Sequence, residues 1–349
     1  KGKWLNLTFT TGISRNLMTN THIGFMSFYK KTFSVVGVMI LAAIVSFAVR
    51  GLSRSIDFTG GRNYVITFER PVEPEQIRGI IANAFPGTTT SALALGTDHK
   101  TIRISTNYKI ESNSPTVDDE AETILYKALK KAGFVSQPNV ESFKNPDIRE
   151  GGSIISSTKV GPSVAKDITH GAILSVVLAL FAIFVYILIR FRNMAFSIGS
   201  TIALAVDTII VLGVYSLCWG WMPFSLEIDQ TFIGAILTVI GYSINDKVVV
   251  FDRIRENMQL HQKQDFKTLF NDSINQTLTR TINTSTSTLI VLLCIFFLGG
   301  ESIRSFSFAM SLGVIVGTLS SIFVAAPIAF LTLGKQKGKR RASAEVVEA

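Results

Sequence analysis

The chain has 349 residues, of which 47% are hydrophobic and only 17% are charged. This composition indicates a membrane protein. The formal net charge of +9 gives little support to nucleic-acid binding, because the basic residues gather beside apolar segments. Six apolar runs each approach the ~20 residues that a helix needs to cross a hydrocarbon layer of ~30 Å. We therefore predict a polytopic α-helical membrane protein with six transmembrane helices.

The predicted elements can be followed along the chain. Residues 1–31 are expected to form a cytoplasmic lead-in, and because they begin at Lys1 without Met or a cleavable signal, we interpret them as part of a longer polypeptide. The predicted transmembrane helices cover residues 32–49, 171–189, 194–217, 230–251, 279–298 and 306–333. Residues 50–169 form a soluble domain, 252–278 an amphipathic cytoplasmic connection, and 334–349 a basic cytoplasmic tail.

The soluble segment 50–169 has the pattern of a small α+β domain. Its order of strand and helix signals, β-α-β-β-α-β, predicts a ferredoxin-like fold. The expected strands are Asn63–Glu69, Leu93–Leu95, Thr101–Thr106 and Val140–Lys144, and the expected helices are Glu73–Phe85 and Val117–Ala132. We find no His/Cys cluster, nucleophile arrangement or phosphate loop in this segment, so we predict that its polar positions form a solvated face or a binding surface, with no metal site and no catalytic site.

The orientation of the helices follows from the basic residues beside them, because Lys and Arg accumulate on the cytoplasmic side of a membrane. Four basic clusters fall on one side when the six helices alternate in direction. Their members are Lys30, Lys31, Arg190, Arg192, Arg253, Arg255, Lys263, Lys267, Lys335, Lys337, Lys339, Arg340 and Arg341. The connection Cys218–Asp229 has no Lys or Arg, and the last connection has only Arg304. We therefore predict cytoplasmic termini and a periplasmic soluble domain, with the basic clusters near anionic lipids.

Asp246 is the most informative residue, because it lies inside the otherwise apolar stretch Thr231–Phe251. An ionisable group there costs roughly 2.5–3.5 kcal/mol on insertion scales, so it normally faces the protein interior or a hydrated path and has a function. The alternative is a buried acid that is permanently paired and only fixes helix packing. We favour a proton-coupling role for Asp246.

Arg280 opens an unusually polar fifth helix. Arg280, Asn283, Thr284 and Ser287 follow a spacing that places them on one helix face, which could line a hydrated path. Arg280 should lie at a depth similar to that of Asp246, so an ion pair between them is geometrically reasonable, and a change in their separation would move a proton on or off the acid. The alternative for Arg280 is a side chain that anchors the helix end at the interface.

A third intramembrane acid, Asp207, lies near the middle of the third helix. It either belongs to the same proton relay or has a structural role, hydrogen-bonded to neighbouring hydroxyls or backbone. Lys247 follows Asp246 directly, but adjacent helix positions point about 100° apart, so we expect Lys247 to reach the cytoplasmic interface or another partner. Gly313 and Gly317 have the spacing that permits close helix packing.

Four motifs then point to one family. They are Asp57-Phe58-Thr59-Gly60-Gly61 after the first helix, Val160-Gly161-Pro162-Ser163-Val164 before the second, Gly241-Tyr242-Ser243-Ile244-Asn245-Asp246 with the following Val248–Asn257, and Gln276-Thr277-Leu278-Thr279-Arg280-Thr281. In these motifs and in their order, from about Lys31 to Leu333, the chain resembles the SecF family of protein-export membrane subunits, which belongs to the resistance-nodulation-division superfamily. Residues 1–31 resemble the junction of a fused SecD and SecF polypeptide.

The resemblance implies a subunit that uses the proton-motive force to promote translocation and release of secreted proteins across the bacterial inner membrane. It implies Asp246 as the proton-carrying acid, with Asn245 beside it and with Arg280 and Thr284 as associated residues. Lys247 departs from the small residue expected after Asn-Asp. The implied partners are SecD or a fused SecD half, the SecYEG translocon, a YajC-like subunit, the unfolded exported polypeptide and membrane lipids, without nucleic acid. No cofactor is implied other than protons as the coupling ion, and no enzymatic activity.

Two other classes of function share some of these features. A proton-coupled exporter of small molecules or lipids from the same superfamily would also carry an intramembrane acid. A passive scaffold that recruits partners to the translocon would need no titrating acid. An assay of transport and a test of whether Asp246 titrates would separate these classes from protein export.

Overall fold

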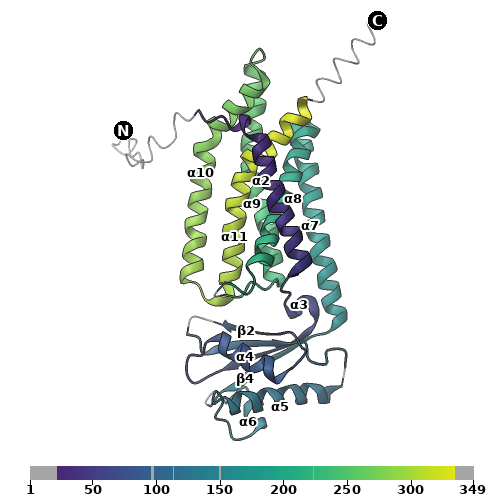
Figure 1. Ribbon diagram of the computed structural model, residues 1–349, viewed down its shortest axis with the longest axis vertical. Helices are drawn as coiled ribbons and strands as arrows, with labels where there is room; N and C mark the ends of the chain where they lie inside the picture. The colour runs from purple at the N-terminus through teal and green to yellow at the C-terminus, as the bar shows by residue number, and fades with distance from the viewer. Residues whose placement is uncertain (1–21, 96–97, 113, 149–150, 223, 335–349) are drawn as a thin grey trace, which may run out of the picture.

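The computed structural model describes residues 22–95, 98–112, 114–148, 151–222 and 224–334. Most of the predicted lead-in 1–31 and of the predicted tail 334–349 therefore lies outside the described residues. A bundle of long helices carries a small sheet domain at one end, and the described chain begins and ends at the other end (Figure 1).

Within the described residues, six helices are long and apolar enough to cross a membrane. They are α2 (Tyr29–Val49), α7 (Pro162–Phe191), α8 (Met194–Cys218), α9 (Gln230–Leu260), α10 (Phe266–Leu298) and a last span, Ile303–Gly334, formed by α11 (Glu301–Ser320), the π-helical turn η3 (Ser321–Ala325) and the helical residues after it. A short 3-10 helix, η2 (Phe25–Ser27), precedes α2. The helices α9 and α10 extend into the predicted connection 252–278, so most of that connection is helical.

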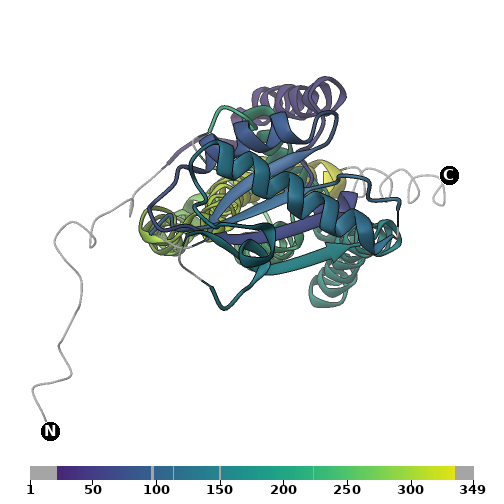
Figure 2. The same cartoon turned by 90° about the horizontal axis from the view of Figure 1, so that it is seen from below.

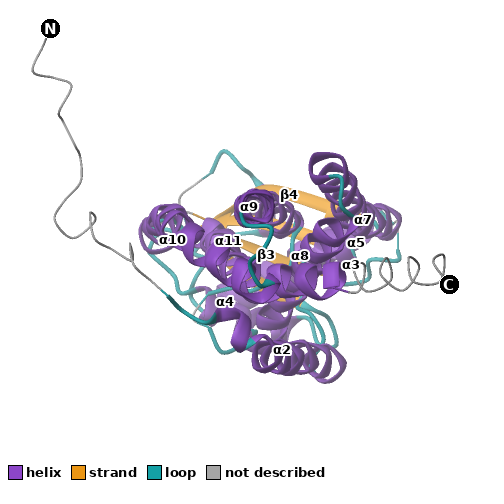
Figure 3. Cartoon of the chain, turned by 90° about the horizontal axis from the view of Figure 1, so that it is seen from above, coloured by secondary structure: helices purple, strands orange, loops and turns teal. Residues whose placement is uncertain are grey.

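The bundle has a central and an outer set of helices. In the most apolar 18-residue segment of each helix, 56% of the residues are buried in both α8 and the last span. The corresponding share is only 11% in α2 and 6% in α7. Seen from above, α2, α7 and α10 lie at the outside of the bundle (Figure 3). Their exposed apolar side chains are suited to contact with lipid. Their backbone is suited to it as well, because a helix satisfies its own backbone hydrogen bonds.

The sheet domain contains four antiparallel strands in the order β2-β3-β1-β4. The strands are β1 (Gly61–Thr67), β2 (Thr90–Leu95), β3 (Thr101–Thr106) and β4 (Ser153–Val160), and the helices are α3 (Ile56–Thr59), α4 (Pro74–Ala84), α5 (Pro115–Lys131) and α6 (Val140–Lys144). Tyr64 and Ile66 on β1 pack with Ile77 of α4 and Leu125 of α5 in one apolar core. Viewed from below, the helices lie across the sheet (Figure 2).

The predicted fourth strand, Val140–Lys144, is wrong, because this segment is the helix α6. The Asn139 side chain accepts a hydrogen bond from Ser142 N at 2.7 Å and so caps the helix, and Phe143 is fully buried. The fourth strand is instead Ser153–Val160. It lies at an edge of the sheet and exposes Ser156 to Lys159, so it lacks the apolar alternation on which the strand prediction depended.

Candidate functional site

Asp246 lies within α9, and the whole residue is only 3% exposed. Its Oδ2 atom accepts hydrogen bonds from Ser285 Oγ of α10 at 3.3 Å and from Thr318 Oγ1 of α11 at 3.2 Å. The two hydroxyl oxygens are 2.6 Å apart. The acid therefore lies where three helices meet, and two hydroxyl groups contact one of its carboxylate oxygens.

A second charged cluster surrounds Lys247, whose side chain is fully buried. Lys247 Nζ donates to Asp207 Oδ2 of α8 at 3.0 Å, to Ser243 Oγ of α9 at 2.6 Å and to Ser320 Oγ of α11 at 3.0 Å. Ser243 Oγ also donates to Asp207 Oδ2, at 2.8 Å. This cluster ties α8, α9 and α11 together around one ion pair.

The helices α9 and α11 approach each other closely beside these clusters. A Cβ atom on Gly313 would lie 2.2 Å from Val239 Cγ2, and one on Gly317 would lie 2.5 Å from Ser243 Oγ. The two glycines therefore permit the close packing that their spacing predicts. The π-helical turn η3 begins directly after Ser320, and such turns often occur at functional sites.

The other predicted site residues are placed differently. Arg280 is exposed, and within the described residues no ion pair joins it to Asp246. The predicted ion pair is therefore absent from this structure, because Ser285 is the α10 side chain that contacts the acid. Thr284 is also exposed, and its hydroxyl donates to the carbonyl oxygens of Arg280 and Thr281 in its own helix. Asn245 is exposed on α9.

The predicted polar face of α10 lies on the outside of the described bundle. Arg280, Asn283, Thr284 and Ser287 are all exposed, and α10 runs along the edge of the bundle in both side and top views (Figures 1 and 3). Polar and charged side chains are rarely directed at lipid, because transfer into hydrocarbon is costly. We therefore expect this face to contact protein or water.

The motif Asp57–Gly61 forms the junction between the bundle and the sheet. Asp57 Oδ2 accepts a hydrogen bond of 3.4 Å from Gln230 N, at the start of α9. Gly60 has a φ of 75° and lies against Val160 O and the Cα of Pro162, so a side chain would be strained there. At Gly61 a Cβ would lie 2.5 Å from Ile56 Cγ2.

The remaining motif residues have local roles. Thr59 Oγ1 donates to Ser55 O at 3.1 Å within the α3 turn, and Phe58 packs against the apolar core between α8 and α9. Gly161 is the residue before α7, and Pro162 is the first residue of that helix, where proline is well suited to the missing backbone donor. Gly241 lies on the exposed side of α9 with open space around it.

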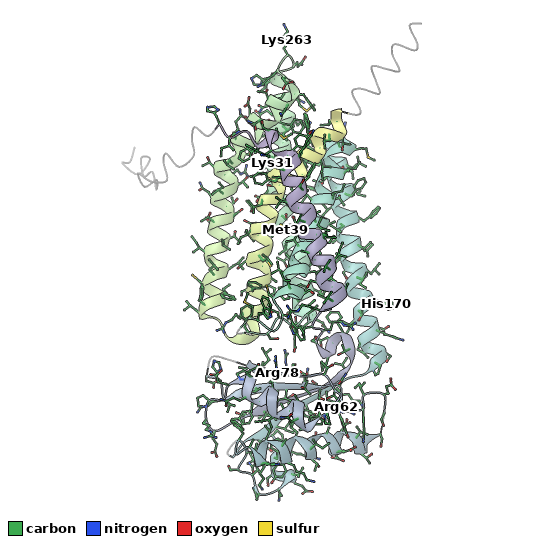
Figure 4. All side chains as sticks on the ribbon, viewed as in Figure 1. Lys31, Met39, Arg62, Arg78, His170 and Lys263 are labelled. Carbon is green, nitrogen blue, oxygen red and sulfur yellow. The ribbon has the colours of Figure 1, made fainter. Side chains whose placement is uncertain are left out.

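A second contact joins the sheet domain to the connection between α8 and α9. Ser55 N donates to Ile228 O at 3.0 Å, and Ile228 N donates to Ser53 O at 2.8 Å. A cavity of ≈ 450 Å³ lies beside this contact, with Arg78 and Glu227 in its lining. Figure 4 places Arg78 on the side of the sheet domain that faces the bundle. Burial raises the pKa of the Glu227 carboxyl, although a hydrogen bond from Ser91 opposes the shift.

The sequence did not single out the hydroxyl groups that contact the two charges. Ser285 belongs to the polar run of the fifth helix, and Thr318 and Ser320 follow Gly317, so small polar residues beside a helix-packing glycine are the signal that could have found them. Within the described ranges, no group of three or more His, Cys, Asp or Glu residues lies close enough to hold a metal ion.

Comparisons with known proteins agree on one family. Residues 142–335 match the family "Protein export membrane protein SecD/SecF, C-terminal", and residues 45–72 match the "SecD/SecF GG Motif". The second match contains Gly60 and Gly61 of the junction.

Relatives of known identity match along nearly the whole chain. The protein translocase subunit SecF of Rhodothermus marinus is 40% identical over 325 residues, covering 93% of this chain and 98% of the relative. The SecF subunit of Escherichia coli O157:H7 is 34% identical over 314 residues, covering 90% of this chain and 88% of the relative.

Fused relatives are longer than this chain. The subunit SecDF of Thermus thermophilus is 34% identical over 305 residues, covering 87% of this chain but 37% of the relative. A crystal structure of the translocon-associated membrane protein SecDF from Thermus thermophilus superposes with a TM-score of 0.70 at 30% identity, covering 91% of this chain and 39% of that one. A structure of SecDF in its super-membrane-facing form gives a TM-score of 0.65, also at 30% identity, covering 94% of this chain and 41% of that one.

Proposed function

Because the chain belongs to the SecF family of protein translocase subunits, we propose that it couples proton flow through Asp246 to the export of polypeptides. Its relatives and its six apolar helices make it a multi-pass protein of the bacterial inner membrane with a role in Sec protein export. The proton-motive force is the energy source in this proposal, and Asp246 is the residue that takes up and releases the proton.

The observation that carries the proposal is the hydroxyl environment of Asp246. A serine or threonine hydroxyl can both donate and accept a hydrogen bond. Ser285 and Thr318 each lie within donating distance of the ionised carboxylate, and either hydroxyl can rotate to accept a hydrogen bond once the acid is protonated. Both protonation states of Asp246 therefore keep hydrogen-bond partners inside the bundle, which a proton carrier requires.

The energy of a proton is sufficient for a conformational change. A proton that crosses a potential of ~150 mV releases roughly 3.5 kcal/mol, at about 2.3 kcal/mol per 100 mV. A bias of 1.4 kcal/mol changes a two-state population ratio by about tenfold. Protonation of Asp246 would weaken its hold on Ser285 and Thr318, and we propose that α10 and α11 then shift relative to α9.

The sheet domain is the proposed target of this motion. Its strand order β2-β3-β1-β4, with antiparallel neighbours, supports a ferredoxin-like fold. We propose that it lies in the periplasm and contacts the exported polypeptide. Lys263 lies at the end of the bundle opposite the sheet, and Lys31 lies toward that end (Figure 4). These basic residues support a cytoplasmic location for that end and for both termini.

The polar face of α10 supports a partner inside the membrane. The chain spans about two fifths of the fused SecDF chain to which it is structurally similar, so a SecD subunit or SecD half is the proposed partner. Arg280 and Thr284 would then lie in the contact between the two halves, where a second helix can cover them. The SecYEG translocon and a YajC-like subunit are further proposed partners.

Substitution of Asp246 by Asn tests the proposed function. The change removes the titrating group and keeps its size, so we expect assembly with SecD to persist and the proton-dependent stimulation of export to be lost. Export of a secretory precursor into inverted membrane vesicles, with and without a proton gradient, measures this effect.

Asp252→Asn provides the matched control. Asp252 lies on the same helix but is 41% exposed, and it pairs with Arg190 at the surface. Its substitution should leave the proton-dependent stimulation close to that of the parent, since exposed ion pairs contribute little. Full proton-dependent stimulation in Asp246→Asn would disprove the proposal.

A further inference from the structure

Lys247 and Asp207 form the most deeply buried ion pair among the described residues, with side-chain exposures of 0% and 1%. Lys247 directly follows Asp246, the proposed proton carrier, in the chain. Because neighbouring helix positions point about 100° apart, Asp246 faces α10 and α11 while Lys247 faces α8 and the end of α11. Two acids are therefore present in one bundle, each with its own partners.

The partners of Asp207 differ in kind from those of Asp246. The ammonium group of Lys247 has three donors and no acceptor, and it donates to Asp207 Oδ2, Ser243 and Ser320. It can therefore stabilise an ionised Asp207 but cannot accept a proton that Asp207 carries. The hydroxyls around Asp246, in contrast, can serve either protonation state.

The free oxygen of Asp207 leads to the same conclusion. Oδ2 already accepts from Lys247 and Ser243, so an added proton would have to sit on Oδ1. Within the described part of the chain, Oδ1 is buried and has no hydrogen-bond partner. A protonated Asp207 would therefore place an unsatisfied donor in the interior, which is costly.

We infer that Lys247 is a counter-ion that keeps Asp207 ionised and so excludes Asp207 from proton transfer. Asp246 is then the acid in this part of the bundle that exchanges a proton. The same ion pair anchors α9 against α8 and α11, and it thereby keeps Asp246 turned toward Ser285 and Thr318. Lys247 is thus a positioning residue for the proton site. This inference rests on the proposed function of Asp246.

The other charges near the pair do not take over this role. Asp246 directly precedes Lys247 on α9 but contacts Ser285 and Thr318, and Arg280 is exposed on the outer side of α10. From α11, Ser320 contributes a hydroxyl. Removal of the Lys247 ammonium would therefore leave Asp207 without a buried cation, and the acid should then take up a proton, because an unpaired buried carboxylate is strongly disfavoured.

The first test is infrared difference spectroscopy of the membrane-embedded protein, paired with its SecD partner, across a pH series. The parent should show one protonated-carboxyl band from this cluster, and Asp246→Asn should remove it. Lys247→Met should add a second band, and the variant Asp207→Asn/Lys247→Met should lose that second band again. A Lys247→Met spectrum identical to that of the parent would overturn the inference.

The second test is export in the same vesicle assay. Each single substitution, Lys247→Met or Asp207→Asn, leaves a buried ionisable group without its partner, so a lower melting temperature and weaker assembly are expected. The double variant has neither charge and should recover most of the melting temperature and at least half of the proton-dependent stimulation. A folded double variant that keeps the Asp246 carboxyl band but has lost proton dependence would show that Asp207 itself carries protons and would overturn the inference.

The two proposals fail in different ways. If Asp246→Asn keeps its proton dependence, the proposed function fails, whatever the infrared bands of Lys247→Met show. If Asp246→Asn loses it, and the double variant loses it as well while keeping its Asp246 carboxyl band, the proposed function survives and the assignment of Lys247 fails. The exposed ion pair of Asp252 serves again as the control for loss of a carboxylate.

Discussion

Gly317 sets the distance between α9 and α11 next to both charged clusters. A side chain at this position would place its Cβ 2.5 Å from Ser243 Oγ and 2.9 Å from Ser243 Cβ, so Gly317→Val requires the two helices to separate. We expect a loss of about 1–3 kcal/mol of stability, typical of overpacking in a close-packed interior. Thermal unfolding of the purified protein measures the change.

Gly241→Ala is the control for Gly317→Val. Gly241 is also helical, but no atom lies within 4 Å of the Cβ that would be added. Its substitution should change the stability by no more than about 0.5–1 kcal/mol, and in the stabilising direction, because alanine favours a helix more than glycine does. Equal melting temperatures for Gly317→Val and the parent would contradict the packing role.

Single residues of the site differ in how far the sequence reveals them. Asp246 is conspicuous, because a carboxylate inside an apolar run violates the usual pattern of a membrane helix. Ser285 and Thr318 are not, because hydroxyl residues are common in membrane helices and only the packing decides which of them faces the acid. Arg280 shows the limit of depth matching, since the α10 residue that contacts Asp246 is Ser285, further along the helix, and Arg280 is exposed.

At the level of elements, the segment before α2 is hydrogen-bonded to the N-terminal part of α10. Ile23 N donates to Asn275 Oδ1 at 3.0 Å, Asn275 Nδ2 donates to Ile23 O at 2.9 Å, and Met26 N donates to Asn271 Oδ1 at 3.2 Å. Asn275→Ala removes two of these bonds, so the local attachment should weaken by about 1–2 kcal/mol. Hydrogen exchange at the Ile23 amide should then become roughly tenfold faster.

Asn283→Ala on the same helix is the comparison for this change. Asn283 lies on the exposed polar face of α10, away from the segment before α2, so its substitution should leave the exchange rate at Ile23 unchanged. If Asn275→Ala also left the rate unchanged, the side-chain attachment would not hold this segment in place.

Long helices were predictable as elements and short strands less so. Each apolar run lies within an observed helix or span, because burial in hydrocarbon imposes a length and a composition. The ends were missed where a helix continues beyond its apolar run, as in α9 to Leu260. The fourth strand was assigned to Val140–Lys144, because the true edge strand Ser153–Val160 carries mostly exposed polar residues and offers little periodic signal.

At the level of the whole molecule, the contact between the sheet domain and the connection 219–229 should depend on pH through Glu227. Burial raises the pKa of this carboxyl in the docked state, against the opposing effects of Ser91 and of Arg103. The docked state therefore binds a proton more tightly than an undocked one. Docking should be strongest below the ordinary glutamate pKa and should weaken as the pH rises through the raised value.

Hydrogen exchange of residues 219–229 over a pH series, corrected for the chemical exchange rate, measures this docking. Glu227→Gln stays neutral and should remove the pH trend. Glu120→Gln is the control, because Glu120 is an exposed acid whose pKa is lowered by its hydrogen bonds with Lys109 and Tyr108. A pH trend that persists in Glu227→Gln would assign it to another group.

The direct link from β4 to α7 joins the sheet domain to a long helix, so that a small tilt of the helix produces a larger displacement at its end. One residue, Gly161, separates the end of β4 from Pro162, and α7 then continues without interruption to Phe191. A helix of 30 residues is about 45 Å long, so a tilt of about 5° about one end moves the other end by about 4 Å. Such a lever arm would convert sub-ångström rearrangements at a buried hydrogen bond into a stroke comparable to the advance of an extended polypeptide by about one residue.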